Sequence, residues 1–217
     1  MRILHIDCSP REASHSREIS AAIVARLRAM HPQASVLRRD LGRDPLPHAD
    51  AGYAIALSTP EALAAAEATD ATRLSEQLIG EIESADVLVI GTPMNNFTVP
   101  SVLKAWIDQV LRVGRTIGMA PTGEKIGLLR DKPVYIAIAS GGVFSGERAR
   151  QPDFLTPYLT AAFGCIGLTM LQFLCLQATA FRDDGELAAD RQALIETLDT
   201  SSLDARAHGS QRQVASA

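Results

Sequence analysis

The chain has 217 residues, of which 47% are apolar and 21% are charged, with 15 Gly and 11 Pro. These proportions are typical of a globular domain and exclude collagen-like, disordered and low-complexity chains. Lys and Arg number 21 against 25 Asp and Glu, which gives a formal net charge of −4 at pH 7. Because the basic residues are scattered along the chain, no nucleic-acid partner is expected.

The apolar runs and the cysteines indicate the compartment. The longest runs fall far short of the roughly 20 residues that cross a bilayer, and Asp7 lies where a signal peptide would be apolar. Cys8, Cys165 and Cys175 form neither a Cys-x-x-Cys pair nor a cluster with His, which predicts reduced thiols and no metal site. We therefore expect a cytoplasmic protein that does not enter a membrane.

Predicted strands and helices alternate along the chain. Short apolar runs predict strands at residues 3–6, 35–39, 86–91, 134–139 and 170–176. Apolar residues at helical spacing predict helices from Ser14 or Ser16 to Met30, and at 60–84, 100–111, 154–163 and 187–198. The helix at 60–84 is expected to be interrupted near Thr69, and the region of Pro45 and Pro47 to lack regular structure. In the helix at 100–111, Lys104, Asp108 and Arg112 are expected to face water.

This alternation predicts one doubly wound α/β domain over residues 1–200, with a parallel sheet and helices on both faces. Residues 201–217 are predicted to form a polar, frayed tail. In such sheets ligands bind at the carboxyl ends of the strands. Three of the predicted strands are followed there by unusual loops.

The first loop joins the first strand to the first helix and contains Ser9, Ser14, His15 and Ser16. Hydroxyls at a helix N-terminus suit a phosphate monoester, because free backbone N–H groups and the helix dipole favour an anion there. A simple capped turn is the alternative. Arg17 is interpreted as an exposed helix charge, with contact to the phosphate as the alternative, and His15 as either a phosphate neighbour or an exposed side chain.

The second loop follows the strand at 86–91 and contains Pro93, Met94, Asn95, Asn96 and Phe97. Its backbone and amide groups can bind the edge of a planar heterocycle, while the Met and Phe side chains supply apolar contact. The alternative is an ordinary strand-to-helix loop with a core Phe.

The third loop follows the strand at 134–139 and contains Ser140, Gly141, Gly142 and Val143. Two glycines without Cβ atoms allow the backbone to approach a flat ligand closely. A simple turn is the alternative. The case for a ligand comes from the three loops together, since all are expected at the same edge of one sheet.

Other motifs are absent or incomplete. No Gly-x-Gly occurs, so the dinucleotide-binding fingerprint is missing, and there is no Gly-x-Ser-x-Gly elbow. Cys8 follows the first strand as in low-molecular-weight tyrosine phosphatases, but Ser14 stands where that family needs Arg. Cys8 and His5 are therefore interpreted as core residues.

The motifs together resemble those of the FMN-dependent NADH azoreductase and quinone reductase family, which has a flavodoxin-like fold. Four segments between about Arg2 and Ala180 carry the resemblance: Ser-Pro-Arg with Ser-x-Ser at 9–16, Pro-Met-x-Asn-Phe at 93–97, Leu-Lys-Ala-Trp-Ile-Asp at 103–108 and Ser-Gly-Gly at 140–142. The resemblance implies five parallel strands in the order 2-1-3-4-5.

The resemblance also implies roles for the loop residues. Ser9 and residues 14–16 would hold the FMN phosphate, residues 93–97 would contact the flavin ring, and residues 140–143 would bound its other side. Three departures fall on the substrate side. Asn95 stands where the family usually has Tyr, Ser-Gly-Gly replaces Ser-Arg-Gly-Gly, and Ile117 replaces a common aromatic residue.

The activity implied is that of an FMN-dependent oxidoreductase. NADH or NADPH would reduce the flavin, and a quinone or azo compound would then accept two electrons at the same site. Because the flavin carries the chemistry, no catalytic side chain is expected. The resemblance further implies a homodimer with active sites at its interface.

Two alternatives remain at this point. One is a flavodoxin-like electron carrier that passes electrons to a protein partner, and the other is a binding module without redox activity. The extra length at 45–69 and 114–132 favours the enzyme, because these segments can build a substrate pocket.

Overall fold

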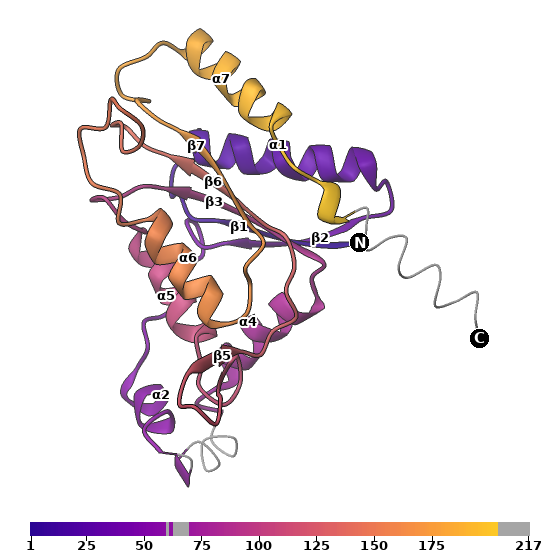
Figure 1. Cartoon of the computed structure of the whole chain (residues 1–217), viewed down its shortest axis with the longest axis vertical. Coiled ribbons are helices and arrows are strands. Elements are labelled where there is room, and N and C mark those ends of the chain that lie inside the picture. Colours follow the sequence, from indigo (N-terminus) through magenta and orange to yellow (C-terminus); the bar gives the residue numbers. More distant parts are fainter. Residues whose placement is uncertain (60, 63–69, 204–217) are drawn as a thin grey trace.

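A five-stranded parallel sheet forms the centre of the protein (Figure 1). The computed structural model describes residues 1–59, 61–62 and 70–203. The strands lie in the order β2-β1-β3-β6-β7, and their bounds are β1 Arg2–Asp7, β2 Ser35–Asp40, β3 Val87–Pro93, β6 Val134–Ala139 and β7 Leu171–Leu176. The five predicted strands and their predicted order are therefore confirmed.

Helices cover both faces of the sheet (Figure 1). On one face lie α1 His15–Met30 and α7 Asp184–Glu196. On the other lie α4 Arg73–Ser84, α5 Ser101–Val110 and α6 Thr156–Cys165. Successive residues of β3 enter opposite cores: Val87 and Val89 pack with α1 and α7, and Leu88 and Ile90 pack with α4 and α5. The uninterrupted apolar run of β3 follows from burial on both faces.

The region of Pro45 and Pro47 lacks regular structure, as expected. It is followed by a short helix that the sequence did not predict, α2 Ala51–Ala56, and the Asp50 carboxylate caps this helix by accepting a hydrogen bond from Tyr53 N at 2.8 Å. One expectation about the helices is corrected. Arg112 does not face water. It is buried, donates to Ser75 Oγ at 3.0 Å and is paired with Glu76, so its charge is compensated inside the fold.

The predicted helix at 60–84 is observed as α4 from Arg73 onward. Residues 60 and 63–69, including the predicted interruption near Thr69, lie outside the described residues.

The segment 114–132 contains a two-stranded antiparallel ribbon of β4 Ile117–Met119 and β5 Lys125–Gly127. The ribbon lies against the turn that follows α6. A Cβ atom at Gly127 would come within 2.0 Å of Gly167 N, and Gly167 has a φ of +93°. At the tip of the ribbon, by contrast, a Cβ atom at Gly123 would meet nothing within 4 Å. The base of the ribbon is therefore tightly packed and its tip is open.

The C-terminal end of the described chain is packed. Leu203 is buried in the core beside α1 and α7, so the predicted frayed tail does not begin at residue 201. Residues 204–217 lie outside the described residues. Within the described ranges, no helix combines the length and the hydropathy needed to span a membrane.

Candidate functional site

The three loops singled out from the sequence meet at the carboxyl edge of the sheet. They follow β1, β3 and β6, which are adjacent strands. Cys8 N donates to Gly91 O at 2.8 Å, and Met94 N donates to Ala139 O at 2.9 Å. The strand order thus brings together segments more than 40 residues apart in sequence, at the edge where parallel sheets bind ligands.

The first loop presents buried hydroxyls at the start of α1. Ser9, Ser14 and Ser16 are each at most 2% exposed, and the Oγ atoms of Ser14 and Ser16 lie 3.0 Å apart. Ser14 is the N-cap residue with extended backbone, yet its side chain makes no capping hydrogen bond. The alternative of a turn that is capped by this side chain is therefore excluded. The serine hydroxyls and the free N–H groups of the first turn lie together at the positive end of the helix dipole.

His15 lies at the border of this group. It is half-buried, and its Nδ1 lies 3.2 Å from Arg191 Nη1 and 3.6 Å from Glu18 Oε2. Its neighbours are therefore charged side chains of α1 and α7.

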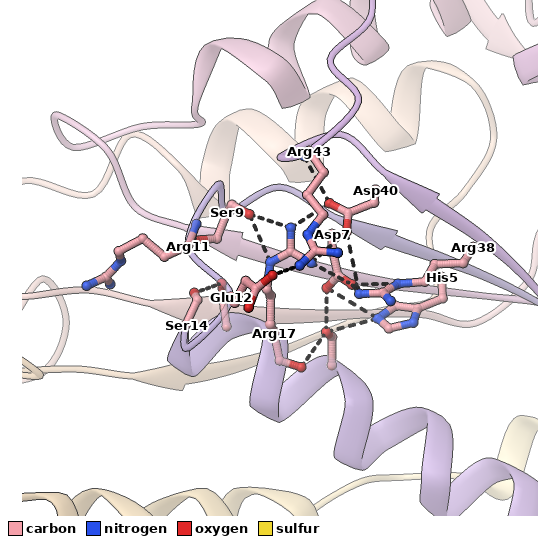
Figure 2. A network of polar contacts seen from close by, with 12 residues as sticks. His5, Asp7, Ser9, Arg11, Glu12, Ser14, Arg17, Arg38, Asp40 and Arg43 are labelled. Atoms are coloured by element: carbon pink, nitrogen blue, oxygen red, sulfur yellow. Dashed lines mark hydrogen bonds and ion pairs between the residues drawn. The ribbon is translucent and has the colours of Figure 1, made fainter.

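A buried charge network supports the first loop (Figure 2). The expectation of an exposed Arg17 is wrong, since this side chain is only 8% exposed. Its Nε and Nη2 donate to Ser9 O at 2.9 and 2.5 Å. Its Nη1 and Nη2 donate to the Asp40 carboxylate at 2.8 and 2.5 Å. Arg17 thus connects the backbone of the first loop to the end of β2, and its guanidinium holds the pKa of Asp40 below the usual range.

Asp7 occupies the centre of the same network. Its Oδ1 accepts from Ser20 Oγ at 2.9 Å, and its Oδ2 accepts from Arg38 Nη2 at 2.7 Å. Burial by itself would raise the pKa of Asp7. The hydrogen bond and charge of His5, with the hydrogen bonds of Arg38 and Ser20, outweigh that effect and lower the pKa to about 2. Asp7 therefore stays ionised beside Arg17, whose Nη1 lies 3.5 Å away.

The structure agrees with the interpretation of Cys8 and His5 as core residues. Cys8 is fully buried, and burial raises the pKa of its thiol, which is the opposite of what a nucleophilic cysteine needs. The His5 Nε2 atom lies 3.0 Å from Ser20 Oγ. Both side chains are therefore buried, as expected for core residues.

The second loop is a tight turn exposed to solvent. Asn95 and Thr98 exchange two backbone hydrogen bonds of 3.0 Å, and the two residues between them have positive φ values, +47° at Asn96 and +71° at Phe97. A bulky residue in this region of φ is uncommon and strained. Phe97 is 45% exposed, and its carbonyl accepts from Phe154 N at 3.0 Å. The expected alternative of a core Phe is therefore excluded.

The third loop is held by the segment that follows β7. Backbone N–H groups of residues 178–180 donate to the carbonyls of residues 140–142 at 3.1 to 3.4 Å. The Gln177 amide oxygen accepts from Phe144 N at 2.8 Å and from Ser145 N at 3.0 Å. Ser140 is buried, and its Oγ lies 3.9 Å from Met94 Sδ. The second and third loops are therefore in direct contact.

Sequence reasoning missed the residues that position these loops. Arg17 resembles an exposed helix charge in the sequence. Asp40, Gln151 and Gln177 were not considered, since each reaches the site from a different segment. A signal existed for one pair only: β1 and β2 both end in Asp, and the parallel register places Asp7 opposite Asp40.

Comparisons with known proteins agree with this geometry. Residues 1–198 match the family described as flavodoxin-like fold. A relative from Pseudomonas fluorescens named FMN-dependent NADH:quinone oxidoreductase 4 is 48% identical over 84% of this chain and 86% of its own. A relative from Burkholderia lata named FMN-dependent NADH:quinone oxidoreductase 5 is 43% identical over 90% and 93%.

A solved structure shows the same architecture. The azoreductase from Bacillus anthracis superposes with a TM-score of 0.75 at 25% identity, covering 90% of this chain and 97% of that one. The chain therefore belongs to the flavodoxin-like family, among relatives that are named FMN-dependent NADH:quinone oxidoreductases.

Proposed function

We propose that this protein is an FMN-dependent oxidoreductase that takes reducing equivalents from NADH and passes two electrons to a quinone or an azo compound. Its relatives are named for FMN, NADH and quinone, and its structural neighbour is an azoreductase. The observation that carries the proposal is the start of α1. Three buried serines gather there and the N-cap side chain leaves the helix N–H groups uncapped, which suits a phosphate monoester.

The residues present fit FMN. Ser9, Ser14 and Ser16 would hold the phosphate, with His15 beside it. The second and third loops, at 93–97 and 140–143, would hold the ring, because they lie on the same edge and contact each other through Met94 and Ser140.

When bound, FMN supplies the hydride and two-electron chemistry. The protein's residues would bind and orient the ring, and the exposed second loop would leave room for a donor and then an acceptor. Asn95, Asn96 and Phe97 are all exposed and are the side chains that a flat substrate would meet. No side chain is needed as a nucleophile or as a general acid.

Steady-state assay separates this proposal from an electron carrier and from a binding module. Purified protein loaded with FMN should oxidise NADH repeatedly when a quinone is present, with parallel double-reciprocal lines at several quinone concentrations. A single stoichiometric oxidation would contradict the enzyme and favour the carrier. Absence of FMN binding would contradict the site.

We further propose a cytoplasmic homodimer whose partner chain completes the ring end of the site. Phe97 and Phe154 support this, since they are 45% and 59% exposed and lie side by side through the Phe154 N to Phe97 O hydrogen bond. Twofold dimers are the commonest soluble assemblies. Light scattering should give twice the 23.2 kDa chain mass. A fully active monomer would contradict the dimer.

A further inference from the structure

Gln151 lies between the two loops assigned to the flavin ring. It belongs to the long connection between β6 and α6 and is half-buried. Its Nε2 lies 3.1 Å from Ser140 Oγ and 3.2 Å from Met94 Sδ. Ser140 and Met94 are themselves 3.9 Å apart. One side-chain amide therefore contacts both loops at the point where they meet.

Gly142 makes room for this amide. A Cβ atom at position 142 would lie 2.4 Å from Gln151 Oε1 and 3.0 Å from its Cδ. The same test at Gly141 finds only Ala180 Cβ at 3.5 Å, which is an ordinary contact. The Gln151 amide therefore occupies the space that a side chain at Gly142 would need.

The backbone on both sides of Gln151 is fixed. Arg150 N donates to Val143 O at 2.9 Å, which closes the loop before it. The Asp153 carboxylate accepts from the N–H groups of Leu155 and Thr156 at 2.9 Å each, which anchors the chain at the start of α6. Gln151 is thus held from both directions, as a group that positions others must be.

We propose that Gln151 is a positioning residue for the flavin ring. Its amide locks the Ser140 hydroxyl and the Met94 thioether into one arrangement, so that the ring end of the site is formed before FMN enters. This inference rests on the proposed function. Gly142 has a part in the same arrangement, because its missing side chain leaves room for the Gln151 amide.

FMN titration of the apoprotein tests the proposal. Gln151→Ala should raise the FMN dissociation constant by about tenfold, the effect of losing an organising polar contact. The visible absorption bands of the bound flavin should move toward those of free FMN. The melting temperature of the apoprotein should stay within about 3 °C of wild type, since the side chain is half-buried. Gln77→Ala is the matched control, because that exposed amide donates to Glu81 on α4, away from the three loops.

Gly142→Ala provides a second, independent route to the same result. Its Cβ should displace the Gln151 amide and reproduce the weaker binding and the spectral change. Combined with Gln151→Ala it should cause no further loss, because the clashing atoms are gone and the effects of coupled residues do not add.

Three results would overturn the inference. The first is a wild-type dissociation constant and spectrum in Gln151→Ala. The second is a lower melting temperature with FMN binding unchanged. The third is full additivity in the double variant. Failure of the wild-type protein itself to bind FMN would instead overturn the proposed function, and this inference with it.

Discussion

The first and second loops differ in how they are held, although both belong to one site. The first loop rests on a buried network in which Arg17 joins Ser9 O to Asp40 and Asp7 lies beneath. The second loop is an exposed turn with two residues at positive φ. Under the proposed function the first loop would hold a phosphate, which has the same shape and charge in every complex, so this end of the site can be rigid. The second loop would lie at the ring end, which has to admit a donor and then an acceptor, and it is exposed.

Arg17→Met tests the supported loop and should have the largest effect. It removes the buried one of the two arginines shared by the carboxylates of Asp7 and Asp40 and leaves only the exposed Arg38 beside them. Removing one member of a buried charge network costs up to about 3–5 kcal/mol. Urea unfolding at pH 7 should show this loss. Arg28→Met, on the exposed part of α1, should stay within about 0.5 kcal/mol of wild type. A loss below about 1 kcal/mol for Arg17→Met would contradict the supporting role.

Asp7→Asn should reveal the same network through pH. The folded-state pKa of about 2 lies below the ordinary value of 3.8, so ionised Asp7 stabilises the fold by about 2 kcal/mol at neutral pH. Because the pKa is lowered on folding, this stabilisation is present above pH 3.8 and disappears as the pH falls toward 2. The difference in unfolding free energy between wild type and variant should therefore shrink between pH 7 and pH 3.

Asp44→Asn, at an exposed position nearby, is the control and should show no such dependence. An Asp7→Asn difference that stays constant over this range would show that the carboxylate charge contributes nothing.

Ser16→Ala should affect ligand binding more than folding. Losing one hydroxyl donor to a charged phosphate costs about 1.5 kcal/mol, or about tenfold in the FMN dissociation constant. Fluorescence titration measures this. Ser58→Ala, where an exposed hydroxyl donates to Ile55 O, should leave binding unchanged. Equal affinities for wild type and Ser16→Ala would remove Ser16 from the phosphate site.

Phe97→Asn should have the smallest effect, and opposite signs for stability and binding. Asn adopts positive φ more readily than Phe, so the apoprotein should gain up to about 1 kcal/mol. FMN affinity should fall, because the aromatic contact is lost. Thermal unfolding and FMN titration of the same samples measure both. A variant that is less stable than wild type would show that the turn is not strained.

The sequence predicted the sheet and the three loops because buried parallel strands have uninterrupted apolar runs that end abruptly in polar residues. It did not predict how the loops are supported. Arg17 lies in the polar first turn of α1, and no neighbouring residue in the sequence distinguishes it from a charge that is exposed to water. Its burial depends on Asp40, which is 23 residues away and becomes its neighbour only through the parallel pairing of β1 and β2.

The misplaced Arg112 and the unpredicted α2 have different origins. Arg112 follows a helix whose spacing puts it on the polar side, but α4 places Ser75 and Glu76 against it. After the Pro-rich segment, a single capping carboxylate at Asp50 starts a helix that is too short for apolar periodicity to reveal. A contact between distant segments decided the outcome at Arg112, and a local hydrogen bond decided the outcome at α2.

The base and the tip of the ribbon of β4 and β5 differ in whether they have room for added atoms. At its base Gly127 and Gly167 leave no volume for a side chain, whereas at its tip the space around Gly123 is open and the constraint at this residue is its φ of +85°. Lengthening a loop costs only about 0.6 kcal/mol for each doubling. Insertions, affinity tags or reporter groups placed at the tip would therefore leave the fold intact, so the ribbon is a natural attachment point for protein engineering.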